Sequence, residues 1–178
     1  MEALEAIMTR RSVREYTGGP VSDDDLETIL KAAMNAPSAG NERPWRFVVV
    51  REPETLRRLA KATPFAKPLA GAGVGIVVCA DRRALKSPGF WPIDTSAATE
   101  NLLLAAHAIG LGGVWMGVHP IPMFKTAVRR IVGLPRLVVP VSLVAIGHPA
   151  RLPAPVERFD PAFIHAERWG EHPEPPVT

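Results

Sequence analysis

Residues 37–45 read Pro-Ser-Ala-Gly-Asn-Glu-Arg-Pro-Trp and join a predicted helix over residues 23–36 to a predicted strand over residues 46–51. A simple connection between two such elements needs only a few residues. This segment instead combines two prolines, a glycine, an asparagine and a tryptophan. Loops of such specific composition often shape a site on a rigid scaffold. The composition alone fits a helix stop followed by a turn equally well.

Hydrophobic periodicity predicts the elements on both sides of this loop. Helical spacing of apolar residues predicts helices over residues 2–9, 23–36, 53–61, 94–109 and 122–132. Short apolar runs predict strands over residues 46–51, 74–80 and 138–146, and a short strand or turn over residues 113–117. The alternation of helices and strands indicates one mixed α/β domain.

Capping and breaker residues set the expected boundaries. Ser22 is the expected N-cap of the helix over residues 23–36. Asp94 or Thr95 is expected to cap the helix over residues 94–109, after a surface loop over residues 81–92, and Gly110 is expected to end it. Pro140 predicts an edge strand or an early position within its strand, because proline cannot donate to a sheet ladder.

The helix over residues 94–109 is apolar on almost every face, which is typical of a buried helix. A domain of 178 residues has little material to surround such a helix, so we predict that a second subunit covers it. A central core helix in a monomer is the alternative. After residue 149 the chain is rich in proline and loses periodicity, as in a tail that wraps over a partner or stays partly loose.

Composition excludes several classes of function. The net charge of +3 and the scarcity of aromatic residues argue against nucleic-acid binding. Cys79 is the only cysteine and lies in an apolar run, so we predict a buried, inert thiol, no disulfide and a reducing cytoplasm. Glu2 and Glu5 interrupt any signal-peptide core, and no apolar stretch is long enough to span a membrane. The five histidines lack metal-binding spacing, so no metal site is predicted.

One further segment suggests ligand binding. Residues 10–14 read Arg-Arg-Ser-Val-Arg, and guanidinium groups beside a serine hydroxyl suit a phosphate monoester. A solvated basic turn is the alternative. The chain contains no GxGxxG after a strand, no P-loop, no HExxH motif and no nucleophile elbow.

The two segments together resemble the FMN-dependent nitroreductase family. The resemblance begins with Arg-Arg-Ser-Val-Arg-Glu-Tyr at residues 10–16 and Ala-Pro-Ser-Ala-Gly-Asn at residues 36–41, followed by Pro44 and Trp45. It continues in order through Glu-Asn-Leu-Leu-Leu-Ala-Ala-His at residues 100–107, Gly-Leu-Gly-Gly-Val-Trp at residues 110–115 and Val-Ala-Ile-Gly-His-Pro at residues 144–149. Arg158, His165, Glu167 and Trp169 close it, so it covers essentially the whole chain.

This resemblance implies an α+β fold: a three-layer sandwich with a central, mainly antiparallel sheet flanked by helices, in an intertwined homodimer. It implies one domain over residues 1–178, whose tail from about residue 150 extends over the partner subunit. It also implies an enzyme in which FMN takes hydride at N5 from NADH or NADPH. The electrons then pass in a ping-pong reaction to a nitroaromatic, a quinone or a similar conjugated acceptor. A different reaction on the same fold, such as flavin cleavage or dehydrogenation of a small metabolite, and a non-catalytic FMN carrier or sensor remain alternatives.

The resemblance also implies roles for individual residues, and none of them is catalytic because the flavin carries the chemistry. Arg10, Arg11 and Ser12 would bind the flavin phosphate and ribityl chain, and Arg14 would approach the N1–O2 edge of the ring. Pro37, Ser38, Ala39 and Asn41 would reach the flavin from the other subunit. Val114, Trp115 and Met116 would pass near N5 and the other face of the ring, and Arg158 would add a late phosphate contact.

Two positions depart from the family pattern. Arg43 stands where the family commonly has glutamine before Pro-Trp, and arginine only donates hydrogen bonds whereas glutamine also accepts them. Arg43 either favours an anionic acceptor or a phosphate-bearing donor, or points to solvent. Glu157 is a poor neighbour for a phosphate, which weakens the assignment of Arg158.

Overall fold

The computed structural model describes residues 1–83, 85–154 and 156–171. Its helices are α1 (Ala3–Thr9), α2 (Asp23–Met34), α3 (Pro53–Ala60), α4 (Trp91–Ala108) and α5 (Pro122–Val132). Its strands are β1 (Trp45–Val50), β2 (Val74–Asp81), β3 (Gly112–Gly117) and β4 (Val138–Gly147). Three short 3-10 turns, η1 (Ala39–Asn41), η2 (Lys67–Gly71) and η3 (Pro161–Phe163), complete the described elements. Each predicted helix and strand is present, and residues 113–117 belong to a strand.

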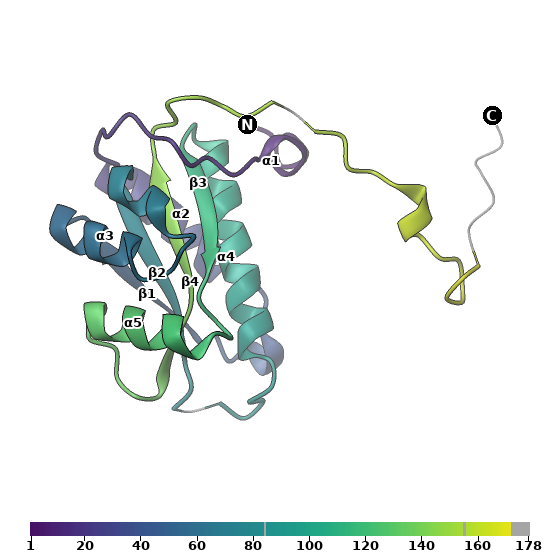
Figure 1. Cartoon of the computed structure of the whole chain (residues 1–178). Helices are drawn as coiled ribbons and strands as arrows, with labels where there is room; N and C mark the ends of the chain where they lie inside the picture. The colour runs from purple at the N-terminus through teal and green to yellow at the C-terminus, as the bar shows by residue number, and fades with distance from the viewer. Residues whose placement is uncertain (84, 155, 172–178) are drawn as a thin grey trace.

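The four strands form one antiparallel sheet in the order β1-β2-β4-β3 (Figure 1). The prediction of an edge strand from Pro140 is therefore wrong, because β4 lies between β2 and β3. The alternative, an early position, is confirmed: Pro140 is the third residue of β4. The register between β2 and β4 shifts between Val78 and Cys79, and Cys79 faces Pro140. An irregularity of this kind is where an inner strand tolerates a residue without an N–H group.

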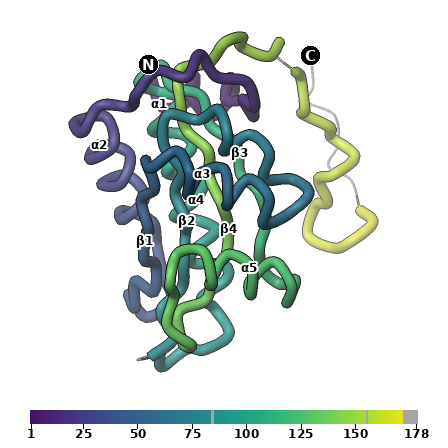
Figure 2. The backbone as a smooth tube through the Cα atoms, turned by 60° about the vertical axis from the view of Figure 1, so that its left-hand side comes forward, coloured from purple at the N-terminus to yellow at the C-terminus, as the bar shows by residue number. Residues whose placement is uncertain are grey.

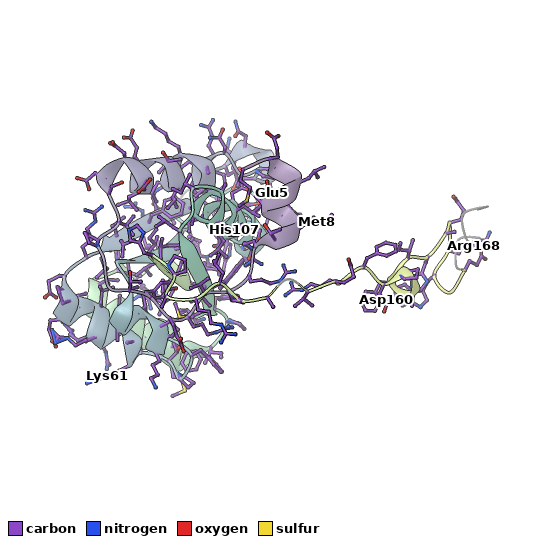
Figure 3. All side chains as sticks on the ribbon, turned by 90° about the horizontal axis from the view of Figure 1, so that it is seen from above. Glu5, Met8, Lys61, His107, Asp160 and Arg168 are labelled. Atoms are coloured by element: carbon purple, nitrogen blue, oxygen red, sulfur yellow. The ribbon has the colours of Figure 1, made fainter. Side chains whose placement is uncertain are left out.

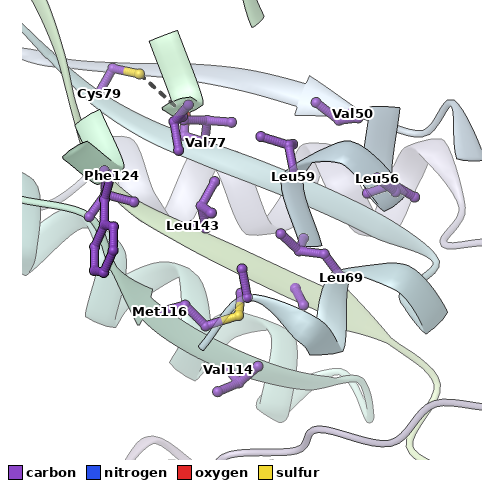
Figure 4. Packing of buried hydrophobic residues seen from close by; sticks show 14 of the residues in the cluster. Val50, Leu56, Leu59, Leu69, Val77, Cys79, Val114, Met116, Phe124 and Leu143 are labelled. Carbon is purple, nitrogen blue, oxygen red and sulfur yellow. Dashed lines mark hydrogen bonds between the residues drawn. The ribbon is translucent and has the colours of Figure 1, made fainter. Parts of the chain in front are cut away.

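Helices cover both faces of the sheet, which confirms the three-layer α+β sandwich (Figures 1 and 2). Along β2, Val77 and Cys79 pack with α3 and α5, whereas Ile76 and Val78 pack with α2 and α4. Figure 4 shows the first of these clusters. Cys79 is fully buried there, as predicted, and burial raises the pKa of its thiol to about 12, so the thiol stays protonated.

The long helix α4 begins three residues earlier than predicted, at Trp91, with Phe90 as its N-cap. The loop expected over residues 81–92 therefore ends before Trp91. Pro92 does not prevent this, because the first turn of a helix needs no N–H donor at that position. Asp94 and Thr95 lie inside the helix and do not cap it. Gly110, with a φ of +87°, follows the C-cap Ile109 and ends the helix as predicted.

Apolar side chains remain exposed on two parts of the molecule. On the body, Leu4, Ile7 and Met8 of α1 and Ile93 of α4 are exposed, and Figure 3 shows α1 lying beside α4 near His107. Beyond residue 150 the described chain projects away from the body (Figures 1 and 3) and carries several exposed large apolar side chains. They include Phe159 (73% exposed), Phe163 (80%) and Trp169 (90%). No helix of the described chain is long and apolar enough to cross a bilayer.

Candidate functional site

The segment Arg10–Tyr16 runs beside the start of β3. The Val13 N–H donates to the Gly113 carbonyl at 3.0 Å, and Ser12 pairs with Gly113 in an isolated bridge. The approach is so close that a Cβ atom on Gly112 would lie 2.7 Å from the Cβ of Val13, so this position requires glycine. The Tyr16 hydroxyl donates to the carbonyls of Val13 (2.7 Å) and Ala145. The sheet thereby fixes the segment that carries Arg14.

A cavity of about 890 Å³ opens where this segment meets the edge of the sheet. Its lining comprises Arg14, Glu15, Tyr16, Phe65, Lys67, Pro68, Ala70, Gly71, Val114, Trp115, Met116 and Gly117. The structure thus brings together Arg14, Val114, Trp115 and Met116, which are four of the predicted site residues. The wall formed by Phe65 and η2 was not predicted. This wall contributes the exposed aromatic ring of Phe65 and the cation of Lys67, so the lining combines apolar side chains with two basic ones and the acidic Glu15.

A second cavity, of about 410 Å³, shares Arg14 and Glu15 with the first. Ser12 and Val13 line it on one side, and Arg151, Pro153 and Ala154 line it on the other. The predicted residue Ser12 therefore lines the same cavity as Arg14. Arg151, at the start of the tail, adds a cation that the sequence analysis did not identify.

Arg10 and Arg11 are anchored within the chain and line neither cavity. The Arg10 guanidinium donates from Nε to Glu100 at 3.0 Å. Arg11 donates from its terminal nitrogens to the carbonyls of Met8, Arg10 and Val156. The Arg11 Nε is buried and has no hydrogen-bond partner among the described residues. A buried donor without an acceptor costs free energy.

The Pro37–Trp45 loop is held by its own side chains and by α4. Gly40, Asn41 and Arg43 all have positive φ, of 55°, 54° and 48°. The Ser38 Oγ accepts the N–H of Arg43 at 3.0 Å, and the Asn41 Oδ1 accepts the Nε–H of Arg43 at 3.0 Å. Three left-handed residues in four positions explain the glycine and asparagine, which tolerate this conformation best. The loop is thus an ordered turn of defined shape.

The loop also touches the first half of α4. The carboxylate of Asp94 accepts the N–H of Ala39 at 3.1 Å, and Trp45 is buried in a small cluster with Ala36 and Ala98. Asp94 was predicted as a helix cap, so its use as an anchor for this loop was missed. The signal available in the sequence was an acidic residue within the predominantly apolar helix, which also contains Glu100.

Comparison with known proteins gives the family. The model of the nitroreductase family matches residues 7–64 and 63–148. The chain belongs to the nitroreductase family. A relative named "Putative NADH dehydrogenase/NAD(P)H nitroreductase" from Archaeoglobus fulgidus is 48% identical, over 94% of this chain and 99% of its own. One of the same name from Methanothermobacter thermautotrophicus is 45% identical, over 95% of this chain and 88% of its own.

Solved structures of this nitroreductase family share the fold. A crystal structure from Parabacteroides distasonis, described as a "Putative NADH dehydrogenase/NAD(P)H nitroreductase", has a TM-score of 0.90 and 36% identity. The match covers 94% of this chain and 98% of that one. An "FMN-dependent Nitroreductase" from Clostridium difficile has a TM-score of 0.87 and 27% identity, over 93% of this chain and 99% of its own.

In this nitroreductase-family chain the predicted site residues fall into two groups along α4. The Pro37–Trp45 loop contacts α4 at Asp94, whereas Arg10 contacts Glu100. The Thr9 hydroxyl lies 2.8 Å from Nε2 of His107. Asp94 and His107 are thirteen positions apart on α4, which corresponds to roughly 20 Å at about 1.5 Å per residue. One chain does not bring Pro37, Ser38, Ala39 and Asn41 into the cavity beside Arg14.

Arg158 lies apart from both groups, on the projecting tail. Its backbone N–H donates to the Glu157 carboxylate at 2.8 Å, and Glu157 also accepts the N–H of Phe159. Because these amides occupy Glu157, its charge is partly satisfied by the backbone. The pKa of Glu157 is lowered, chiefly by these backbone hydrogen bonds.

Proposed function

We propose that this chain is an FMN-dependent oxidoreductase that takes electrons from NADH or NADPH and reduces nitroaromatics, quinones or similar conjugated acceptors. The observation that carries this proposal is the cavity in which Arg14 lies beside Val114, Trp115 and Met116. Names of relatives support it, among them the "FMN-dependent Nitroreductase" and an "NADPH-flavin oxidoreductase" from Vibrio harveyi that is 28% identical over 94% of this chain.

The donors around the cavities fit FMN. Its phosphate requires cations and N–H or O–H donors, and Ser12, Arg14 and Arg151 line the second cavity with such groups. Arg11 belongs to the same segment and has a buried Nε without a partner among the described residues. Its flat ring requires apolar walls, which Phe65 and Trp115 supply in the larger cavity. When bound, FMN supplies the two-electron chemistry between the nicotinamide and the acceptor, so no side chain has to act as a nucleophile.

The side chains of this site would bind FMN and adjust the stability of its reduced form. Arg14 and Lys67 place two positive charges on the cavity lining and Glu15 one negative charge, and a net positive charge beside a flavin favours its electron-rich form. Among the described residues Arg14 forms no ion pair, so its charge is available to a ligand. Tyr16 holds the segment in place, and burial raises the pKa of its hydroxyl, so it remains a hydrogen-bond donor at physiological pH.

The proposal includes a homodimer with shared sites. The Pro37–Asn41 turn would complete the cavity of the partner subunit, which explains why it lies far from its own Arg14. The exposed apolar side chains of α1 and α4 would form the interface, and the tail beyond residue 150, with Arg158, would extend over the partner. The single buried Cys79 suits a reducing compartment, and we place the enzyme in the cytoplasm.

An anaerobic reduction experiment tests this function. The purified protein is saturated with FMN, separated from free flavin, and mixed under anaerobic conditions with NADH or NADPH while the flavin absorbance is followed. We expect bleaching with at least one nicotinamide, and recovery of the absorbance when a quinone or a nitroaromatic is added. Bound FMN that neither nicotinamide reduces would favour the carrier or sensor. A protein that takes up no FMN would refute the proposal.

A further inference from the structure

A third cavity, of about 250 Å³, lies at the end of the sheet beside the Pro37–Trp45 loop. Its lining comprises Glu42, Arg43, Pro44, Arg46, Asp81, Arg83 and Leu85. The start of β1 and the end of β2 meet here, since Trp45 pairs with Ala80 and the Asp81 N–H donates to the Pro44 carbonyl at 2.8 Å. The sheet thus brings Arg83 beside Arg43 and Arg46, from a strand end that is distant in the sequence. Of the three, the sequence pattern singles out only Arg43.

The carboxylates of this cavity do not neutralise its arginines. Asp81 is 8% exposed and accepts from Nε of Arg83 at 2.8 Å, with Arg46 at 3.7 Å. The hydrogen bond from Arg83 lowers the pKa of Asp81 to about 2, so Asp81 stays charged and offsets one guanidinium. Glu42 is directed elsewhere: its Oε1 accepts the backbone N–H groups of Lys86 and Ser87. The lining residues thus carry three guanidinium groups and two carboxylates, an excess of one positive charge.

The guanidinium groups are also held in place. Arg46 donates from Nη1 to the carbonyls of Trp45 (2.7 Å) and Arg43 (3.2 Å). Arg43 uses its Nε for Asn41, and no hydrogen bond within the described chain uses its two Nη groups. Each guanidinium has five N–H donors in a planar fork, and this cavity leaves several of them unused. A fixed fork with spare donors matches the oxygens of a phosphate, a carboxylate or a sulfonate.

We propose that this arginine cavity binds a terminal anionic group of a substrate. The inference rests on the proposed function, because the turn that holds Arg43 through Asn41 is the turn expected to reach the flavin of the partner subunit. The cavity would then lie at the outer rim of that flavin site. Two substrates offer the required chemistry: a nicotinamide donor with a 2′-phosphate, and an acceptor that carries a carboxylate or sulfonate.

Paired ligands that differ only in charge test the proposal. Titration calorimetry of the FMN-loaded protein with NADP⁺ and NAD⁺ measures the preference for a phosphate-bearing donor. Turnover with 4-nitrobenzoate and 4-nitrobenzamide measures the preference for an anionic acceptor. In at least one pair we expect the charged member to be favoured about tenfold, as for one charge-assisted hydrogen-bond pair. No preference in either pair would overturn the proposal.

Three variants locate the preference. We expect Arg43→Gln and Arg83→Gln to lower the charged-over-neutral ratio about tenfold. Arg57→Gln, which removes an exposed arginine paired with Glu54 on α3, should leave the ratio at the wild-type value. Arg83→Gln removes a partner of the buried Asp81 and could fail to fold, whereas Arg43 is exposed, so Arg43→Gln alone keeps the test decisive.

The outcomes distinguish a failure of the proposed anion site from a failure of the proposed oxidoreductase function. If the neutral donor or acceptor still reacts with the flavin but the charged-over-neutral ratio is the same in wild type and in Arg43→Gln, the anion site is refuted and the oxidoreductase stands. If the protein takes up no FMN, or if neither nicotinamide reduces it, the proposed function fails and the anion site fails with it.

Discussion

The Arg10–Tyr16 segment and the Pro37–Trp45 loop are both short and irregular, but they are anchored in different ways. The first is bonded to the sheet, through Val13 and Gly113 and through Tyr16 and Ala145, and it forms one wall of a cavity whose other walls belong to the same chain. The second is bonded mainly to itself and to the first half of α4. None of its residues lines the large cavity of its own chain.

This difference indicates which part of the proposed site one chain can complete. Within one chain, the Arg10–Tyr16 segment supplies cations and the Ser12 hydroxyl, and β3 supplies apolar lining. The loop is equally well ordered, yet none of its residues lines the large cavity of its own chain. Between the two lies α4, whose outer face and neighbour α1 leave Ile93, Leu4, Ile7 and Met8 exposed. A second subunit on this face would cover the apolar side chains and join the two halves of the site.

The largest effect is expected from a charge placed on the outer face of α4. Ile93 is 65% exposed in the single chain, so Ile93→Glu in a monomer should change stability by no more than about 0.5 kcal/mol. In a subunit interface the same carboxylate would be buried without a partner. We therefore expect a monomer by sedimentation velocity and an FMN affinity at least about 100-fold weaker in a fluorescence titration, or about 2.7 kcal/mol.

Met123→Glu is the matched control, because Met123 is 72% exposed on α5. Phe124 and Val128 of α5 pack on the face of the sheet opposite to α4. It should leave the assembly and the FMN affinity unchanged. A monomeric Ile93→Glu protein that binds FMN like the wild type would show that one chain completes the site. A variant that remains dimeric would show that the subunits meet elsewhere.

The next largest effect concerns the phosphate end of the site. Arg11→Ala removes the buried Nε that has no partner, so the FMN phosphate would lose a charge-assisted hydrogen bond worth about 1.5–3 kcal/mol. We expect FMN affinity to fall roughly 10- to 100-fold. Arg10→Ala should weaken binding less, because Glu100 already holds the Arg10 guanidinium. Thermal unfolding of the variant is measured as well, because Arg11 also donates to three carbonyls. Only a variant as stable as the wild type assigns the loss of affinity to the phosphate contact.

Arg11→Lys sharpens this test, because lysine keeps the charge and loses the planar fork. An affinity for FMN between those of Arg11→Ala and the wild type is expected. Unchanged affinity in both Arg10→Ala and Arg11→Ala would refute the assignment of this segment to the phosphate.

Local patterns in the sequence were sufficient for most of the fold. Apolar periodicity identified every helix and strand, because each element buries one face or is buried on both. Two errors arose where a breaker residue is tolerated for a non-local reason. Pro92 lies in the first turn of α4, and Pro140 lies opposite an irregularity between β2 and β4. The order of strands that places β4 in the middle of the sheet is set by packing between distant segments, which periodicity does not report.

The candidate site was predictable only in part. Arg14 and the Val114–Met116 stretch were identified because each belongs to a contiguous motif, and the structure does bring them together. The wall made by Phe65 and Lys67 carries no motif and becomes visible only when η2 folds against the edge of the sheet. Likewise, the contact between Asp94 and Ala39 joins residues that are 55 positions apart.

The contact between Asp94 and Ala39 leads to the prediction with the smallest expected change in FMN affinity. Asp94→Ala removes the acceptor of the Ala39 N–H and leaves this donor unpaired, at a cost of about 1–3 kcal/mol in the free energy of unfolding. The Pro37–Asn41 turn would lose its anchor to α4, and FMN affinity should fall roughly 3- to 10-fold, or about 0.7–1.4 kcal/mol.

Asp94→Asn separates the two contributions, because the amide keeps an oxygen acceptor at the same position. We expect Asp94→Asn to bind FMN nearly as well as the wild type, whereas Asp94→Ala does not. If Asp94→Ala lowers stability in thermal unfolding but leaves FMN affinity unchanged, the turn has no part in the flavin site. The cavity beside β3 would then be complete in each chain, and the ordered shape of the Pro37–Trp45 loop would serve the packing against α4 alone.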